Sequence, residues 1–396
     1  MKFGKKSIGA ITAGLSLAMT LTGIAPTMAL AADPTPATIP SVQKTLKVND
    51  GSTVTATFKY DIKAIALETG VVNSDGTKEM TYTDGPTASV ADITLTAENA
   101  EKQGTGAISF TKDNKSGIDA FDHAGVYAWT IKEVTEGQDE PKATDGKGTF
   151  QNDEQTYTLM VSVANKSDNS GLYFESVAIY KGTATKTNNV KDDGTPVDEK
   201  TDKLSFENKY TEDTDENNSD KNPSNLTITK TVTGGQGDQS KDFHFTVKFT
   251  APDILPEQYK NDDGTYNKTQ YLTDIAEANG ASDEDAAQGQ VTFTLRHNGS
   301  KTFTGLVAGT TYTVIETEAG KDGYSTSYEG KANGVETKTN SGNLVGEKAN
   351  DLTVTNDKTS TPITGVIVNN APFVITIAVA AAGAVAYGAA KRKLEK

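Results

Sequence analysis

The chain has 396 residues, a formal net charge of −15 and no cysteine. The acidic balance argues against nucleic acid as a partner, and the lack of cysteine excludes disulfides as cross-links. The three histidines lie far apart without metal-ligand spacing, and no hydrolase or nucleotide-binding motif is present. We therefore expect a protein that is not an enzyme and holds neither a metal nor a cofactor.

The first 31 residues have the pattern of a secretory signal peptide. A basic start that includes Lys5 and Lys6 precedes an apolar stretch over residues 8–30, which ends in small residues near Ala32. An N-terminal membrane anchor is the alternative, but the apolar stretch is short and interrupted by Gly and Pro. Export of the chain raises the question of what replaces the disulfides that usually strengthen extracellular proteins.

The rest of the chain divides into two candidate domains, residues 41–210 and 222–357. Each contains many short runs in which apolar and polar residues alternate, which is typical of strands with one buried face. Residues 211–221 are acidic, rich in Asn and without apolar periodicity, and this composition indicates a linker. The pattern predicts an all-β protein with tandem domains.

Both candidate domains contain the same three landmarks in the same order. A Lys lies in the opening strand, a Glu ends a late strand and an Asn lies in the closing strand. Because side chains alternate between the faces of a strand, all six fall on the apolar side, as Lys44 does with Val42 and Leu46. The residues are Lys44, Glu133 and Asn208 in the first domain and Lys230, Glu316 and Asn356 in the second.

Such a set is expected to meet inside each domain, since an isolated buried charge is costly. Burial lowers the pKa of a lysine and raises that of a glutamate, which favours a neutral amine beside a protonated acid. The amine could then attack the Asn side-chain carbonyl while the Glu moves protons and ammonia leaves. A buried Lys–Glu ion pair with the Asn hydrogen-bonded to it is the alternative.

The C-terminal segment, residues 361–396, has three parts. Thr361-Pro-Ile-Thr364-Gly365 precedes an apolar run over residues 373–390, which would span about 27 Å as a helix, and a basic tail follows. Alone, this pattern is that of a membrane anchor. It resembles a Gram-positive cell-wall sorting signal, Leu-Pro-any-Thr-Gly, although Thr361 replaces the usual Leu and leaves the sortase class open. The resemblance implies cleavage between Thr364 and Gly365 and transfer of the Thr364 carbonyl to an amine.

The first domain resembles the N-terminal domain of streptococcal T-antigen-type major pilins. The second is similar to a Cna B-type domain, an immunoglobulin-like β-sandwich. The resemblance implies an isopeptide bond between the opening-strand Lys and the closing-strand Asn of each domain, with the Glu as catalyst. Residue by residue, it implies the bonds Lys44–Asn208 with Glu133 and Lys230–Asn356 with Glu316.

The resemblance predicts a structural pilus subunit on the surface of a Gram-positive bacterium. Its expected partners are a sortase, identical subunits and peptidoglycan, and a host surface ligand is left open. Lys200 and Lys203, just before the closing strand of the first domain, are the candidate lysines for joining subunits, with Lys181 as a weaker candidate. A monomeric wall-anchored adhesin is the alternative, and a secreted hydrolase is poorly supported because no catalytic motif is found.

Overall fold

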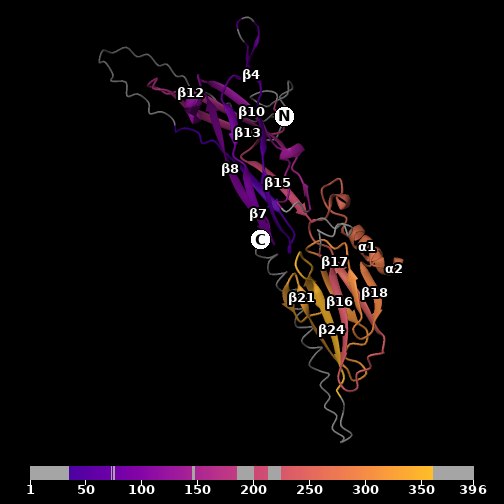
Figure 1. Ribbon diagram of the computed structural model, residues 1–396. Helices are drawn as coiled ribbons and strands as arrows, with labels where there is room; N and C mark the ends of the chain where they lie inside the picture. Colours follow the sequence, from indigo (N-terminus) through magenta and orange to yellow (C-terminus); the bar gives the residue numbers. More distant parts are fainter. Residues whose placement is uncertain are drawn as a thin grey trace, which may run out of the picture.

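The computed structural model describes residues 35–72, 74, 76–144, 148–184, 200–212 and 224–359. The predicted signal peptide, the sorting signal and most of the predicted linker lie outside these residues. Strands β1 to β15 form an N-terminal domain and strands β16 to β24 form a C-terminal domain, and the two lie end to end (Figure 1). Within the described residues, no helix has the length and apolar character that crossing a membrane requires.

The N-terminal domain is built mainly from two facing sheets. The larger has the order β11-β15-β1-β8-β6, with β9 paired to β8, and the other has the order β14-β13-β12-β10-β3. The strands of the larger sheet are β1 (Ser41–Lys47), β6 (Thr87–Val90), β8 (Lys102–Lys112), β9 (Lys115–Ser116), β11 (Thr149–Gln151) and β15 (Leu204–Thr211). Those of the other are β3 (Tyr60–Ala64), β10 (Gly125–Glu133), β12 (Thr156–Asn165), β13 (Leu172–Lys181) and β14 (Lys200–Thr201).

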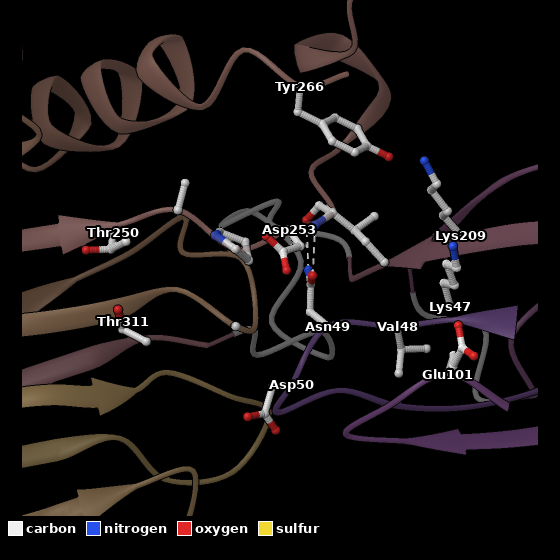
Figure 2. A pocket seen from close by; sticks show the side chains of 14 residues that line it. Lys47, Val48, Asn49, Asp50, Glu101, Lys209, Thr250, Asp253, Tyr266 and Thr311 are labelled. Atoms are coloured by element: carbon white, nitrogen blue, oxygen red, sulfur yellow. Dashed lines mark hydrogen bonds between the residues drawn. The ribbon is translucent and has the colours of Figure 1, made fainter. Parts of the chain in front are cut away.

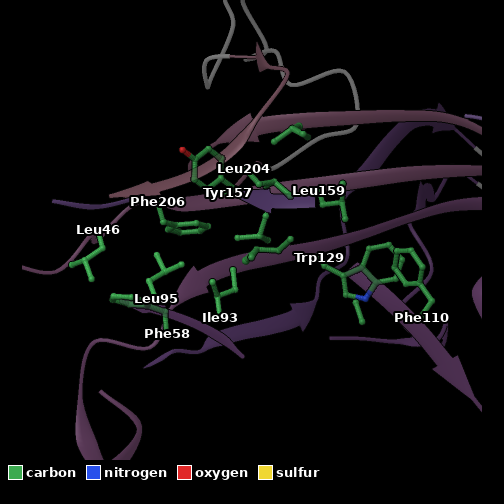
Figure 3. Close-up of a cluster of buried hydrophobic side chains, with 14 of the residues drawn as sticks. Leu46, Phe58, Ile93, Leu95, Phe110, Trp129, Tyr157, Leu159, Leu204 and Phe206 are labelled. Atoms are coloured by element: carbon green, nitrogen blue, oxygen red, sulfur yellow. The ribbon is translucent and has the colours of Figure 1, made fainter. Parts of the chain in front are cut away.

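Two small sheets and two short helices complete this domain. They are β2 (Thr53–Phe58) with β7 (Ile93–Glu98), β4 (Glu68–Val72) with β5 (Lys78–Met80), and the 3-10 helices η1 (Gly117–Ala120) and η2 (Gly137–Asp139). Side chains from both main sheets and from the β2–β7 pair meet in one core. Leu46 and Phe206 come from the larger sheet, Trp129 from the facing sheet and Phe58 from β2 (Figure 3). Alternation along each strand therefore fills the interior from several sides.

The C-terminal domain is also a sandwich of two sheets. Their orders are β19-β16-β24-β21-β22 and β18-β17-β20-β23, and their inner faces share one apolar core. The strands are β16 (Leu226–Thr233), β17 (Phe243–Thr250), β18 (Gln290–Leu295), β19 (Ser300–Phe303), β20 (Thr311–Glu316), β21 (Ser325–Ala332), β22 (Val335–Thr337), β23 (Ser341–Leu344) and β24 (Asp351–Asp357). The predicted fold class, all-β with tandem sandwich domains, is confirmed.

A helical insertion between β17 and β18 is the main departure from the expected pattern. It contains η3 (Glu257–Tyr259), α1 (Lys268–Ala278) and α2 (Asp283–Ala286). The Asn267 side chain caps α1 by accepting a hydrogen bond from the Gln270 backbone N–H. Tyr271 and Ile275, one turn apart, are buried against the C-terminal core.

Direct hydrogen bonds join the two domains. The Gln151 amide donates to the Leu255 carbonyl at 2.7 Å, and the Tyr266 hydroxyl donates to the Gln151 side-chain oxygen at 2.6 Å. A cleft of about 600 Å³ lies beside these contacts and is lined by charges of both signs, including Lys209 and Asp253 (Figure 2). The junction therefore involves specific polar contacts in addition to the connecting chain.

Candidate functional site

Each domain places its Lys and Asn on neighbouring parallel strands of one sheet. β1 runs parallel to β15, and Lys44 pairs with Phe206, two residues before Asn208. β16 runs parallel to β24, and Lys230 pairs with Val354, again two residues before Asn356. A separation of two residues keeps both side chains on the same face, so the Lys and Asn of each domain point into the core together.

The Glu of each set comes from the facing sheet. Glu133 ends β10 and Glu316 ends β20, in each case across the sandwich from the strands that carry the Lys and Asn. All six residues are withdrawn from solvent, with Glu316, at 4% exposure, the most accessible. The sandwich architecture thus brings together three polar residues that are far apart in the sequence.

In the N-terminal domain the three side chains form a closed ring of contacts. The Lys44 Nζ atom donates both to Glu133 Oε2 and to Asn208 Oδ1. The Asn208 Nδ2 atom donates to Glu133 Oε1 at 2.5 Å. The amine thus lies directly against the amide group that it would attack.

In the C-terminal domain Glu316 joins the other two residues. The Lys230 Nζ atom donates to Glu316 Oε2 at 3.2 Å, and the Asn356 Nδ2 atom donates to Glu316 Oε1. The Lys230 Nζ atom also lies 4.4 Å from the ring centroid of Phe243. The amine therefore lies close to aromatic rings, and Glu316 is its carboxyl partner among the described residues.

Burial shifts the proton equilibria of both pairs toward the uncharged forms. It lowers the pKa of Lys230 to about 8, although the Glu316 charge acts in the opposite direction. It also lowers the pKa of Lys44 below its ordinary value and raises the pKa values of Glu133 and Glu316. A neutral amine beside a protonated carboxyl is the state that nucleophilic attack on an amide requires.

Three further residues contact the buried Asn amides, and sequence reasoning did not identify them. Asn208 Nδ2 donates to Asn152 Oδ1 at 3.1 Å, and the Asp153 backbone N–H donates to Asn208 Oδ1 at 3.3 Å. In the other domain, the Thr326 hydroxyl donates to Asn356 Oδ1 at 2.7 Å. No motif marks these positions, because strand register and loop geometry bring them to the site.

The remaining candidate residues lie elsewhere. Lys200 belongs to the edge strand β14, and Lys203 lies two residues after the end of that strand; both are exposed. Lys181, the weaker candidate, is half-buried at the end of β13. Thr364 and Gly365 lie outside the described residues. In the described ranges, no group of acidic and histidine side chains is arranged to hold a metal ion.

Comparison with protein families gives two matches, one for each domain. Residues 40–211 match the Spy0128-like isopeptide containing domain (FctA), and residues 224–358 match a domain of unknown function, DUF7601. No curated protein matches the chain.

Solved structures of pilus proteins are also similar to this chain. The major pilin T3.2 of Streptococcus pyogenes is 18% identical, with 81% of this chain and 99% of that one covered and a TM-score of 0.28. Another major pilin structure from Streptococcus pyogenes is 18% identical, with 81% and 98% covered and a TM-score of 0.29. The pilus-presented adhesin Spy0125 (Cpa) is 12% identical, with 82% and 100% covered and a TM-score of 0.22.

The sandwich fold, the buried Lys–Glu–Asn set and the domain match define a class of protein domain, the isopeptide-containing β-sandwich domain. Within that class, residues 40–211 match the model of the Spy0128-like isopeptide containing domain. The resemblance to streptococcal major pilins stated from the sequence is confirmed. The assignment depends on the domain match and on the geometry of the site.

Proposed function

We propose that each domain forms one intramolecular isopeptide bond during folding and that the bonded subunits are assembled by a sortase into a pilus. The bonds are Lys44–Asn208, promoted by Glu133, and Lys230–Asn356, promoted by Glu316. One observation carries this proposal. In both domains a buried Lys and a buried Asn lie on neighbouring parallel strands, with the Asn two residues beyond the residue that pairs with the Lys, and a buried Glu contacts both.

The reaction balances without any other reagent. The neutral Lys Nζ attacks the Asn Cγ atom, and the carbonyl electron pair moves to Oδ1. The Glu takes a proton from the attacking nitrogen and delivers one to Nδ2, the Cγ–Nδ2 bond breaks, and ammonia leaves. The product is an amide between Lys and Asn. Holding the groups in contact supplies the orientation that a reaction between two weakly reactive partners needs.

Assembly requires a donor and an acceptor on different copies of the chain. The sorting signal makes Thr364 the donor, attached to peptidoglycan or to the next subunit by a sortase. Exposed Lys200 and Lys203 suit the acceptor role, in contrast to Lys44 and Lys230, which are fully buried. This arrangement supports a secreted, wall-attached pilus on a Gram-positive cell, with identical subunits as partners.

The intact mass of recombinant mature protein tests the bonds. Each bond removes one ammonia, about 17 Da, so the wild-type mass should be low by two ammonias. Lys44→Ala and Lys230→Ala should each restore one ammonia, and Lys102→Ala, which removes an exposed lysine of β8, should change nothing beyond its own mass. An unshifted wild-type mass would overturn the proposed bonds.

Wall extracts test the assembly. A covalent polymer appears as a ladder in denaturing gels, and tryptic mass spectrometry should find a branched peptide that joins Thr364 to a lysine of another copy. Attachment of Thr364 to peptidoglycan alone would instead indicate a monomeric wall-anchored protein.

A further inference from the structure

We propose that Thr326 is a catalytic residue of the C-terminal domain, where its hydroxyl stabilises the negative charge that develops on Asn356 Oδ1. This inference rests on the proposed bond between Lys230 and Asn356. Thr326 pairs with Asn356 across the antiparallel strands β21 and β24, and its hydroxyl donates to Asn356 Oδ1 at 2.7 Å. It therefore touches an atom whose charge changes during the reaction.

The surrounding backbone orients this hydroxyl as a donor. The Gly320 N–H donates to Thr326 Oγ1 at 3.0 Å, which occupies the acceptor side of the oxygen. Gly320 has φ +67°, a left-handed conformation that glycine adopts readily, in the turn that precedes β21. With that contact made, the hydroxyl proton is free to point at Asn356 Oδ1. The donor is thus in place before the reaction begins.

The described hydrogen bonds of Glu316 go to other atoms than this carbonyl oxygen. Its Oε2 atom accepts from Lys230 Nζ, and its Oε1 atom accepts from Asn356 Nδ2. Both carboxyl oxygens thus face nitrogen atoms, one attacking and one leaving, as proton transfer between them requires. In the part of the chain that the structure describes, Thr326 makes the hydrogen bond to Asn356 Oδ1. The two tasks are divided: Glu316 moves protons and Thr326 polarises the carbonyl.

The role of Thr326 corresponds to the place where negative charge develops during the reaction. When the Lys230 Nζ atom attacks Cγ, the electron pair of the carbonyl bond moves to Oδ1, where Thr326 donates its proton as a hydrogen bond. As the Cγ–Nδ2 bond breaks, the pair returns and the carbonyl re-forms. A donor fixed at the oxygen lowers the barrier because it stabilises the oxyanion without having to reorient during the reaction.

In the N-terminal domain, a different group donates to the oxygen of the Asn side-chain carbonyl. The backbone N–H of Asp153 donates to Asn208 Oδ1 at 3.3 Å. The Asp153 carboxylate holds this loop in place by accepting from the backbone N–H of Glu207 at 2.7 Å and of Gln155 at 2.8 Å. Substitution of Thr326 should therefore slow only the formation of the Lys230–Asn356 bond. Formation of the Lys44–Asn208 bond in the same molecule then serves as an internal reference.

The test compares Thr326→Val, which keeps the shape but removes the donor, with Thr326→Ser, which keeps the donor. Thr227→Val is the matched control, because Thr227 lies in the same sheet and its hydroxyl bonds only Thr302 among the described contacts. Mature protein is made by cell-free synthesis, translation is stopped, and samples are denatured at intervals for intact mass. Peptide mapping then identifies which Lys–Asn pair has reacted.

Thr326→Val should slow formation of the Lys230–Asn356 bond by about 100-fold or more, on the scale of losing one oxyanion donor. The Lys44–Asn208 bond should form at the wild-type rate, as should both bonds in Thr326→Ser and Thr227→Val. Equal rates in wild type and Thr326→Val would overturn the role of Thr326. No bond in wild type would instead overturn the proposed function.

Circular dichroism checks that each variant folds. If Thr326→Val does not fold, Thr326→Cys replaces it, since a thiol is a weak donor of similar size. Its C-terminal bond should form more slowly than in Thr326→Ser, and equal rates in these two variants would contradict the inference.

Discussion

The side chain of Asn49 pairs with the backbone of Ile254, and these residues belong to different domains. The Asn49 amide donates to the Ile254 carbonyl at 2.8 Å and accepts from the Ile254 N–H at 2.9 Å, as a neighbouring strand would (Figure 2). Asn49 is only 4% exposed. The N-terminal domain thus satisfies two backbone groups of the C-terminal domain that would otherwise be left without partners.

Replacing Asn49 by Ala should loosen the joint between the domains. It leaves a buried N–H and a buried carbonyl unpaired, at a cost of roughly 1–3 kcal/mol for each group that water does not reach. Small-angle X-ray scattering of Asn49→Ala/Gln151→Ala should show a broader range of domain orientations than wild type. Asn261→Ala, in an exposed turn, is the control. Scattering identical to wild type would show that the Asn49 and Gln151 side chains do not restrain the domains.

Glu133→Ala and Glu316→Ala should each leave one Lys–Asn pair unbonded, because the proton carrier is lost. The intact mass should rise by one ammonia relative to the fully bonded form of each variant. Each bond closes a loop of more than 100 residues, and its loss should cost roughly 5 kcal/mol by the chain-entropy estimate, or about 10–20 °C in Tm. Calorimetry measures the shift.

Glu329→Ala, on an exposed position of β21, should keep both bonds and the wild-type Tm. A Glu133→Ala or Glu316→Ala variant with both ammonia losses would show that the carboxyl is not required.

The rate of bond formation in the C-terminal domain should depend on pH in a bell-shaped manner. Burial lowers the pKa of Lys230 to about 8 and raises that of Glu316. Reaction needs a neutral amine together with a protonated carboxyl, so the pair must hold one proton in total. Above about pH 8 the pair loses this proton, and the carboxyl is no longer protonated. Below the raised pKa of Glu316 the pair gains a second proton, which converts the amine to an ammonium that cannot attack.

We therefore expect the rate to fall by about tenfold per pH unit above pH 8. The cell-free time course, repeated on protein transferred to buffers between about pH 5 and pH 10, measures it. A rate that continues to rise up to pH 10 would mean that no proton on Glu316 is needed.

Lys200→Arg/Lys203→Arg should abolish the covalent ladder in wall extracts while both internal bonds still form. Arginine keeps the positive charge but does not act as the acceptor amine, since its guanidinium remains protonated. Lys102→Arg, an exposed lysine of the same domain, should leave the ladder intact. A ladder that persists in the double variant would place the acceptor at another lysine.

Strand alternation was enough to predict which polar residues enter the core. Lys44, Lys230 and their partners follow the same two-residue period as their apolar neighbours, so the sequence indicated their burial directly. The two-residue offset between Lys and Asn could not be predicted, because the register of two distant parallel strands depends on the packing of the whole sheet.

Other features of the structure depend on contacts between distant residues, which no local sequence pattern indicates. Thr326 is one of many threonines in exposed-looking strands, and only its pairing with Asn356 distinguishes it. Asn49 resembles an ordinary turn residue until the second domain is placed beside it. For α1, the sequence does contain a helical pattern, with Asn267 as a cap and Tyr271 and Ile275 one turn apart. It was hidden by the short length of the segment within a β-rich chain.

The parallel pairing of β16 with β24 has a consequence for damage to the protein. With Lys230 joined to Asn356, tension that enters the C-terminal domain through residues 226–230 leaves it through residues 356–357. Residues 231–355 lie on a closed side loop that carries none of it. A protease that cuts any peptide bond in that loop would open a ring without severing the fibre, so a bonded C-terminal domain would tolerate a nick that breaks an ordinary polypeptide.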